Sequence, residues 1–212
     1  MSEYPAYSRA ERIADGTVHA IGLTLAVTGA VLLIATTVGR GTGLTLGVTV
    51  YAAALIATFL ASACYHMTPW EPIRPALRRI DHAAIYLKIA GTYTPLVVLL
   101  GTGFAYGVLG LVWALALVGV VAKVAFWRTP GRFGPALYLA MGWLAVALAW
   151  PLATTLPAGV LALVVAGGLT YSAGVVFYTW ESLRFSNAVW HGFVVAASAC
   201  FFAAIALATA AA

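Results

Sequence analysis

The sequence has very few charged residues for its length. Of its 212 residues only 8% are charged and 63% are hydrophobic, and the mean hydropathy is +0.99. Soluble globular domains carry about 25% charged residues, so a soluble fold of this size would lack the side chains needed to cover its surface. The composition excludes that class and predicts an integral membrane protein, built from helices that satisfy their own backbone hydrogen bonds.

Cysteine is also scarce, and no secretory signal is visible. Cys64 and Cys200 are the only two cysteines, and both lie inside apolar segments, where cysteine usually behaves as a small hydrophobic residue. We therefore expect no disulfide. The first sixteen residues lack the apolar core and cleavage site of a signal peptide, so we expect the first apolar segment to remain as a span.

Seven apolar segments are long enough to cross a bilayer, which takes about 20 helical residues. They are expected at residues 17–38, 44–66, 82–100, 104–126, 135–155, 158–178 and 188–208. The sequence therefore predicts an all-α, seven-transmembrane helix bundle. Residues 17–208 form its single domain, after a cytoplasmic N-terminal segment at residues 1–16.

The loop charges predict the orientation. The loops on the N-terminal side of the predicted bundle carry nine basic residues: Arg9, Arg12, Arg74, Arg78, Arg79, Lys123, Arg128, Arg132 and Arg184. The opposite side carries only Arg40. Because cytoplasmic loops are enriched in Lys and Arg, we expect the N-terminus in the cytoplasm and the C-terminus outside. The net charge of +5 then reflects topology, and no nucleic-acid partner is expected.

All four histidines fall at segment edges on that same side. His19 opens the first segment, His66 closes the second, His82 opens the third next to Asp81, and His191 lies about a turn into the seventh. Ionisable groups within a membrane are costly, and they usually mark a functional site. The sequence therefore predicts a polar site near the cytoplasmic face.

The spacing within this group is compatible with a metal site. Ser62 and His66 are four residues apart, as are Asn187 and His191, so each pair shares a helix face. Imidazole nitrogens and a carboxylate such as Asp81 are suitable zinc ligands, and a catalytic zinc ion keeps one position for water. A nearby carboxylate could orient or deprotonate that water.

Simpler interpretations remain open for several of these residues. His19 could sit at the lipid headgroups or serve helix packing, and Asp81 could cap the start of the third helix. Lys88, inside the third segment, could extend towards the interface or face the bundle interior, where it would need a partner.

Six stretches of the chain resemble the hemolysin III family. They are VHAIG at 18–22, SACYH at 62–66, RIDHAAIY at 79–86, AGTYTP at 90–95, YSAGVVFY at 171–178 and WHGFV at 190–194. The family belongs to the progestin and adipoQ receptor superfamily, which is related to alkaline ceramidases. The resemblance extends from about residue 11 to residue 205.

The resemblance implies seven transmembrane helices and a zinc ion near the cytoplasmic face. The family's ligands are the histidine of an SxxxH motif and two histidines of an HxxxH motif in the last helix, with an aspartate holding a bound water. By position, His66 and His191 match two ligands, Asp81 matches the aspartate, and Ser62 matches the supporting serine.

The chain departs from the family pattern at the first histidine of HxxxH, which is Asn187 here. A further histidine often found ten positions after His191 is replaced by Phe201. We predict a zinc site at His66, His191, Asp81 and Asn187, with Asp81 and Ser62 as catalytic residues. The incomplete histidine set could also be completed by His19 or His82.

Two functions compete. The first is a zinc-dependent hydrolase of the cell membrane acting on a lipid amide or ester, with Asp81 as general base and Ser62 stabilising the oxyanion. The second is a non-enzymatic receptor-like or membrane-homeostasis protein in which the metal is structural. A pore-forming cytolysin is disfavoured, because the spans carry almost no polar residues that could line a channel. Membrane lipids are the expected partners, while the oligomeric state is not indicated.

Overall fold

The computed structural model describes residues 7–126, 133–180 and 182–212, and every regular element within these ranges is helical. The elements are α1 (Arg9–Thr37), α2 (Thr42–Met67), η1 (Glu71–Ile73), α3 (Arg74–Leu100), α4 (Gly103–Ala125), α5 (Phe133–Trp143), η2 (Leu144–Leu148), α6 (Ala149–Thr155), α7 (Ala158–Thr179) and α8 (Ser186–Ala210). Seven helical units are long and apolar enough to cross a membrane, the fifth comprising α5, η2 and α6. The predicted seven-helix fold is confirmed.

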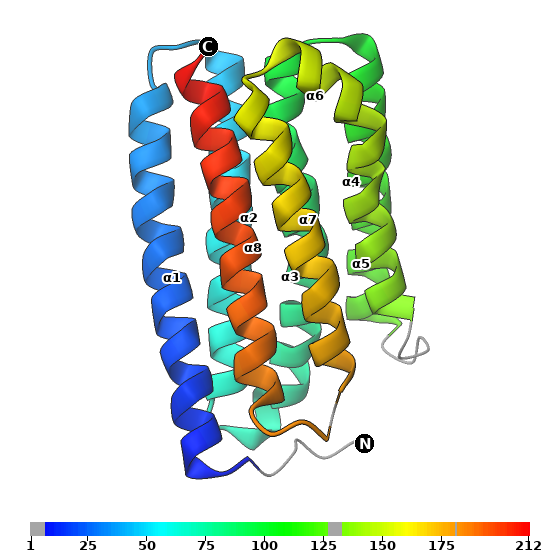
Figure 1. Cartoon of the computed structure of the whole chain (residues 1–212). Helices are drawn as coiled ribbons and strands as arrows, with labels where there is room; N and C mark the ends of the chain where they lie inside the picture. The colour runs from blue at the N-terminus through cyan, green and yellow to red at the C-terminus, as the bar shows by residue number, and fades with distance from the viewer. Residues whose placement is uncertain (1–6, 127–132, 181) are drawn as a thin grey trace.

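The spans stand side by side as one bundle (Figure 1). Helices consecutive in sequence pack together, and α1 also packs on α8, so the first and last helices are neighbours. We call the end where α1, α3 and α8 begin and α2, α4 and α7 end the N-terminal end of the bundle. It is the lower end in Figure 1, and it corresponds to the predicted cytoplasmic side.

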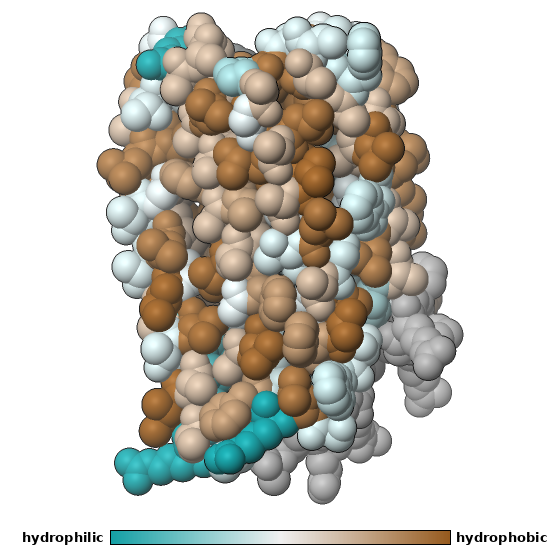
Figure 2. Space-filling model, viewed as in Figure 1, coloured by the Kyte–Doolittle hydropathy of each residue, from teal (hydrophilic) through white to brown (hydrophobic). Residues whose placement is uncertain are grey.

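The outer surface fits a lipid environment. Large apolar side chains are exposed along the spans, for example Leu32 at 59%, Leu117 at 57% and Val176 at 59%. In Figure 2 apolar side chains cover most of the visible face, and most of the strongest hydrophilic colour lies along its lower edge, with a smaller patch at the upper left. Two of the basic residues used to predict orientation, Arg128 and Arg132, lie outside the described residues.

Helix α1 begins about two turns before the predicted span. Ser8 and Glu11 form a capping box, in which the Ser8 hydroxyl accepts from the Glu11 N–H at 3.3 Å and the Glu11 carboxylate accepts from the Ser8 N–H at 2.9 Å. The extension makes Asp15 and His19 helical, four residues apart and on one face.

Helix α3 also begins earlier than predicted, and this corrects the suggested role of Asp81. The helix starts at Arg74, with Pro75 in its first turn, a position where proline is well tolerated. Asp81 therefore lies about two turns inside the helix and is not its N-cap. Its carboxylate is left available for contacts within the bundle.

The fifth span is not one continuous α-helix. The 3₁₀ segment η2 interrupts it just before Pro151. Proline has no backbone N–H to donate to the preceding turn, and its ring clashes with the carbonyl of that turn. Two carbonyls near the end of α5 accept from a side chain of another helix. The Tyr93 hydroxyl on α3 lies 2.8 Å from the Met141 oxygen and 2.9 Å from the Gly142 oxygen.

Close packing of α3 on α4 depends on Gly119. A Cβ atom at this position would lie 2.5 Å from a ring carbon of Tyr86, a side chain with 0% exposure. Because the ring is enclosed, it has no space to move away. Small residues commonly permit such close approach between membrane helices.

We therefore expect Gly119→Ala to destabilise the protein by about 1–3 kcal/mol through overpacking, seen as a lower thermal unfolding temperature in detergent. Gly107→Ala is the matched control on the same helix, since no atom lies within 4 Å of its added Cβ. The control should be neutral or slightly stabilising because alanine favours helix. Equal melting temperatures for the two variants would contradict the packing argument.

Candidate metal centre

Three histidines from three helices meet at the N-terminal end of the bundle. His19 on α1, His66 on α2 and His191 on α8 each offer one ring nitrogen within 4.8 Å of the other two. Their ring centroids are 4.2 Å apart for His19 and His191, 4.6 Å for His66 and His191, and 5.3 Å for His19 and His66. This His19–His66–His191 group is hereafter the histidine cluster.

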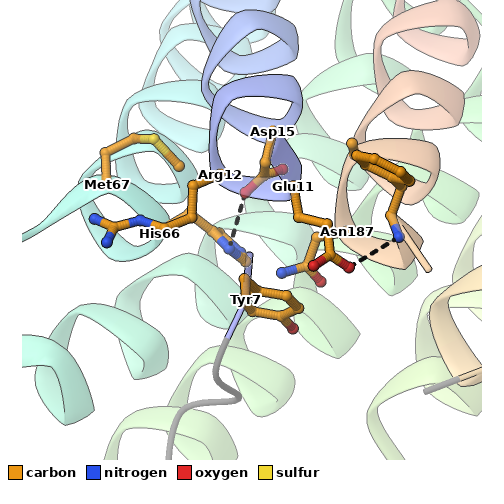
Figure 3. Close-up of a pocket in the computed structure, with 9 residues that line it drawn as sticks. Tyr7, Glu11, Arg12, Asp15, His66, Met67 and Asn187 are labelled. Carbon is orange, nitrogen blue, oxygen red and sulfur yellow. Dashed lines mark hydrogen bonds and ion pairs between the residues drawn. The ribbon is translucent and has the colours of Figure 1, made fainter. Parts of the chain in front are cut away.

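A buried carboxylate, Asp15, contacts all three rings. Its Oδ1 lies 2.8 Å from Nδ1 of His191 and 3.5 Å from Nδ1 of His19, and its Oδ2 lies 3.5 Å from Nδ1 of His66. Asp15 is only 4% exposed. Figure 3 shows it on α1, directed towards His66 across the cavity.

Ser62 and Asp81 lie on another side of the same rings. The Ser62 hydroxyl oxygen is 3.1 Å from Nε2 of His19 and 3.3 Å from Nε2 of His191. Asp81 is 7% exposed, and its carboxylate lies near the Ser62 hydroxyl. The cluster is thus placed between two buried carboxylates, one on α1 and one on α3.

A small cavity adjoins the cluster and opens between the ends of α1, α2 and α8 (Figure 3). Its volume is about 10 Å³, close to the minimum for one water molecule. Asp15, His66 and Asn187 are among its lining residues. The amide of Asn187 therefore borders the site, about one turn before His191 on α8.

Two sets of hydrogen bonds fix the helices that carry the cluster. The Glu11 carboxylate accepts from the backbone N–H of Phe185 at 3.1 Å, which ties α1 to the start of α8. The Arg74 guanidinium donates to the carbonyls of Tyr65 and Thr68 at 3.3 and 2.7 Å, and it pairs with Glu71 at 2.8 Å. These bonds clamp the turn between α2 and α3, next to His66.

Some of the predicted site residues lie in or beside the histidine cluster, and others do not. His66 and His191 come together as predicted, with Ser62 and Asp81 beside them. His19, for which an interfacial or packing role was the simpler interpretation, lies within the cluster. Among the described residues, the group that could hold a metal does not include His82: its Nδ1–H donates to the Arg78 carbonyl at 2.7 Å, and Nδ1 lies 3.6 Å from Oδ2 of Asp81.

Asp15 was missed by the sequence reasoning. The signal that could have found it is its spacing of four residues from His19, together with the capping pattern of Ser8 and Glu11, which extends the helix through Asp15. If the helix began at residue 17, Asp15 would belong to the polar segment that precedes it.

Lys88 faces the bundle interior, which was one of its two predicted placements. It is 5% exposed, its Nζ donates to the hydroxyls of Tyr171 and Ser198, the latter at 2.7 Å, and it lies 4.9 Å from the Phe59 ring centroid. These contacts join α2, α3, α7 and α8. Lys88 thus acts as a polar link between helices, separate from the histidine cluster.

Comparison with known proteins agrees with the motifs. Residues 8–202 match the profile of the family described as Haemolysin-III related. The Hemolysin-3 homolog of Bacillus subtilis (strain 168) is 35% identical over 91% of this chain and 91% of its own length. Hemolysin-3 of Bacillus cereus is 35% identical over 91% of this chain and 89% of its own length. The human Monocyte to macrophage differentiation factor is 28% identical over 74% of this chain and 67% of its own.

We expect Arg74→Lys to lower the free energy of unfolding by about 1–3 kcal/mol, because lysine cannot reproduce the forked contacts of a buried guanidinium. Thermal unfolding in detergent would measure the effect. Arg9→Lys, at an exposed position, keeps the same charge and is the control. If both variants unfold at the wild-type temperature, the clamp contributes nothing measurable.

Proposed function

The chain belongs to the haemolysin-III-related family of multi-pass membrane proteins, and we propose that it is a zinc-dependent hydrolase acting on a lipid amide or ester at the cell membrane. The observation that carries this proposal is the histidine cluster, buried at one end of the bundle between two carboxylates. Catalytic zinc sites use three protein ligands and leave one position open for water.

The donor set fits zinc. Three imidazoles are a common zinc ligand set, and rings whose nitrogens lie within 4.8 Å of one another need only small side-chain adjustments to share one ion. His66 and His191 supply two ligands, and His19 supplies the third imidazole that Asn187 does not provide. Asn187 borders the cavity, where its amide oxygen is placed to contact a bound water or substrate.

The remaining residues have distinct roles. Bound zinc would supply a water whose pKa is lowered to about 7. Asp81 would orient a water at the site and act as its general base, a role that requires a carboxylate within hydrogen-bonding reach. The Ser62 hydroxyl, near both His19 and His191, donates to the oxygen that gains negative charge. A lipid substrate would reach the site from the surrounding membrane.

One feature favours the alternative of a structural metal. The cluster joins α1, α2 and α8, so an ion there would cross-link three helices in the manner of structural zinc sites. A non-enzymatic, receptor-like protein would need no more than this. Pore formation has less support, since within the described ranges the buried acidic, basic and histidine side chains lie at the N-terminal end, apart from Lys88.

We expect purified protein to contain one zinc ion per chain by elemental analysis. His19→Ala, His66→Ala and His191→Ala should each reduce the zinc content strongly, because each removes one of three imidazoles. Asn187→Ala should reduce it less than His19→Ala does. Zinc that persists in both His66→Ala and His191→Ala would place the metal elsewhere, and a larger loss in Asn187→Ala would assign the third ligand to Asn187.

We expect the zinc-loaded protein to hydrolyse a lipid amide, such as a ceramide, or a lipid ester presented in mixed micelles. Asp81→Asn should lower kcat by at least about 100-fold, the usual contribution of a general base, while retaining zinc. Product release would be followed by mass spectrometry. If chelation lowers the melting temperature but neither substrate class is cleaved, the structural alternative replaces the hydrolase.

A further inference from the structure

We propose that Asp15 is the positioning residue of the metal centre, fixing which nitrogen His19 and His191 present to the ion. This inference rests on the proposed metal site but does not require that the site be catalytic. It adds a residue outside the motifs by which the family resemblance was drawn, and it makes α1 a structural partner of the centre.

The first step concerns hydrogen-bond direction. Nδ1 of His191 lies 2.8 Å from the Asp15 carboxylate, and Nδ1 of His19 lies 2.8 Å from the Asp15 backbone carbonyl. Both acceptors have only lone pairs, so each Nδ1 must carry the hydrogen. A neutral imidazole then has its free lone pair on Nε2, the atom that can bind a metal.

The second step concerns convergence. The two Nε2 atoms lie 3.1 and 3.3 Å from the same Ser62 hydroxyl oxygen, so the lone pairs of His19 and His191 are directed to one region. Asp81 borders that region through Ser62. The side chain of Asp15 therefore orients His191 on α8, and the backbone carbonyl of Asp15 orients His19 on α1.

The third step concerns the remaining ring. The second carboxylate oxygen of Asp15 lies 3.5 Å from Nδ1 of His66. Within the described part of the chain, the ion pairs found for Asp15 are all with the three histidines, and none is with arginine or lysine. A buried carboxylate placed in this way favours a metal cation at the cluster and orients the rings that it contacts.

The alternative is that Asp15 only joins α1 to α8 through His191. That role predicts a loss of stability but no specific change in metal binding. A carboxylate that orients metal-ligating histidines is typically worth a 10–100-fold change in metal affinity. Metal affinity measured against the stability of the metal-free protein separates the two roles.

The test uses the full-length protein in detergent, stripped of metal and titrated with Zn²⁺ against a chelator of known affinity and with Co²⁺, whose visible absorption reports its ligands. We expect Asp15→Ala to weaken Zn²⁺ binding by about 10–100-fold and to alter the Co²⁺ spectrum. Asp15→Asn, which keeps the shape and one acceptor oxygen, should give a smaller loss in the same direction, and it replaces Asp15→Ala if that variant does not fold.

Thr17→Ala is the matched control. Thr17 is exposed on α1, two residues after Asp15, and its hydroxyl donates to the Ile13 carbonyl of its own helix at 2.8 Å, so this change should leave Zn²⁺ affinity unchanged. In metal-free protein labelled with ¹⁵N-histidine, NMR should show His19 and His191 with hydrogen on Nδ1. Asp15→Ala should remove this preference at His191, and it should persist in Thr17→Ala.

The outcomes are distinguishable. Wild-type affinity in Asp15→Ala and Asp15→Asn overturns the positioning role and leaves the proposed hydrolase intact. Weakened affinity in a protein that cleaves no lipid supports the positioning role and removes the hydrolase. A wild-type protein that binds neither Zn²⁺ nor Co²⁺ overturns both proposals.

Discussion

Polar groups inside this bundle must satisfy one another, because the hydrocarbon around it offers no hydrogen-bonding partner. This constraint explains where the ionisable residues lie. Lys88, deep in α3, is held by two hydroxyls and lies against aromatic rings. The other buried acidic, basic and histidine side chains of the described ranges gather at the N-terminal end, where Asp15 contacts three histidines at once. The same arrangement that limits the cost of burial brings together three ring nitrogens that could hold a metal ion.

The fold followed from composition and span length, since apolar runs of the right size have few alternatives in a membrane. The ends of the helices were less predictable, and they decide the site. Residues before Thr17 looked like a polar leader because they are charged, whereas Ser8 and Glu11 in fact start a helix. Asp81 looked like a cap because it stands next to the apolar run, whereas α3 extends back through the basic segment to Arg74.

Within the site, His66, His191, Ser62 and Asp81 could be predicted from spacing. Ser62 and His66 share a helix face, Asn187 and His191 share another, and Asp81 follows His66 across one hairpin. His19 and Asp15 depend on the packing of α1 against α8, a contact between the two ends of the sequence that no local pattern encodes. Family resemblance directed attention to position 187, where the expected histidine is asparagine. The additional imidazole comes from a different helix, and spacing within α8 gave no information about it.

The bond between Asp15 and His191 joins residues 176 positions apart, and this has a consequence for biogenesis. During synthesis the first helix enters the membrane long before the last one exists. The Asp15 carboxylate therefore lacks its contact with His191 until α8 has been made. The centre can be completed only when the whole polypeptide has been inserted. Truncation before α8 would leave the Asp15 carboxylate facing two rings instead of three, so the histidine cluster is complete only after the final helix has been inserted.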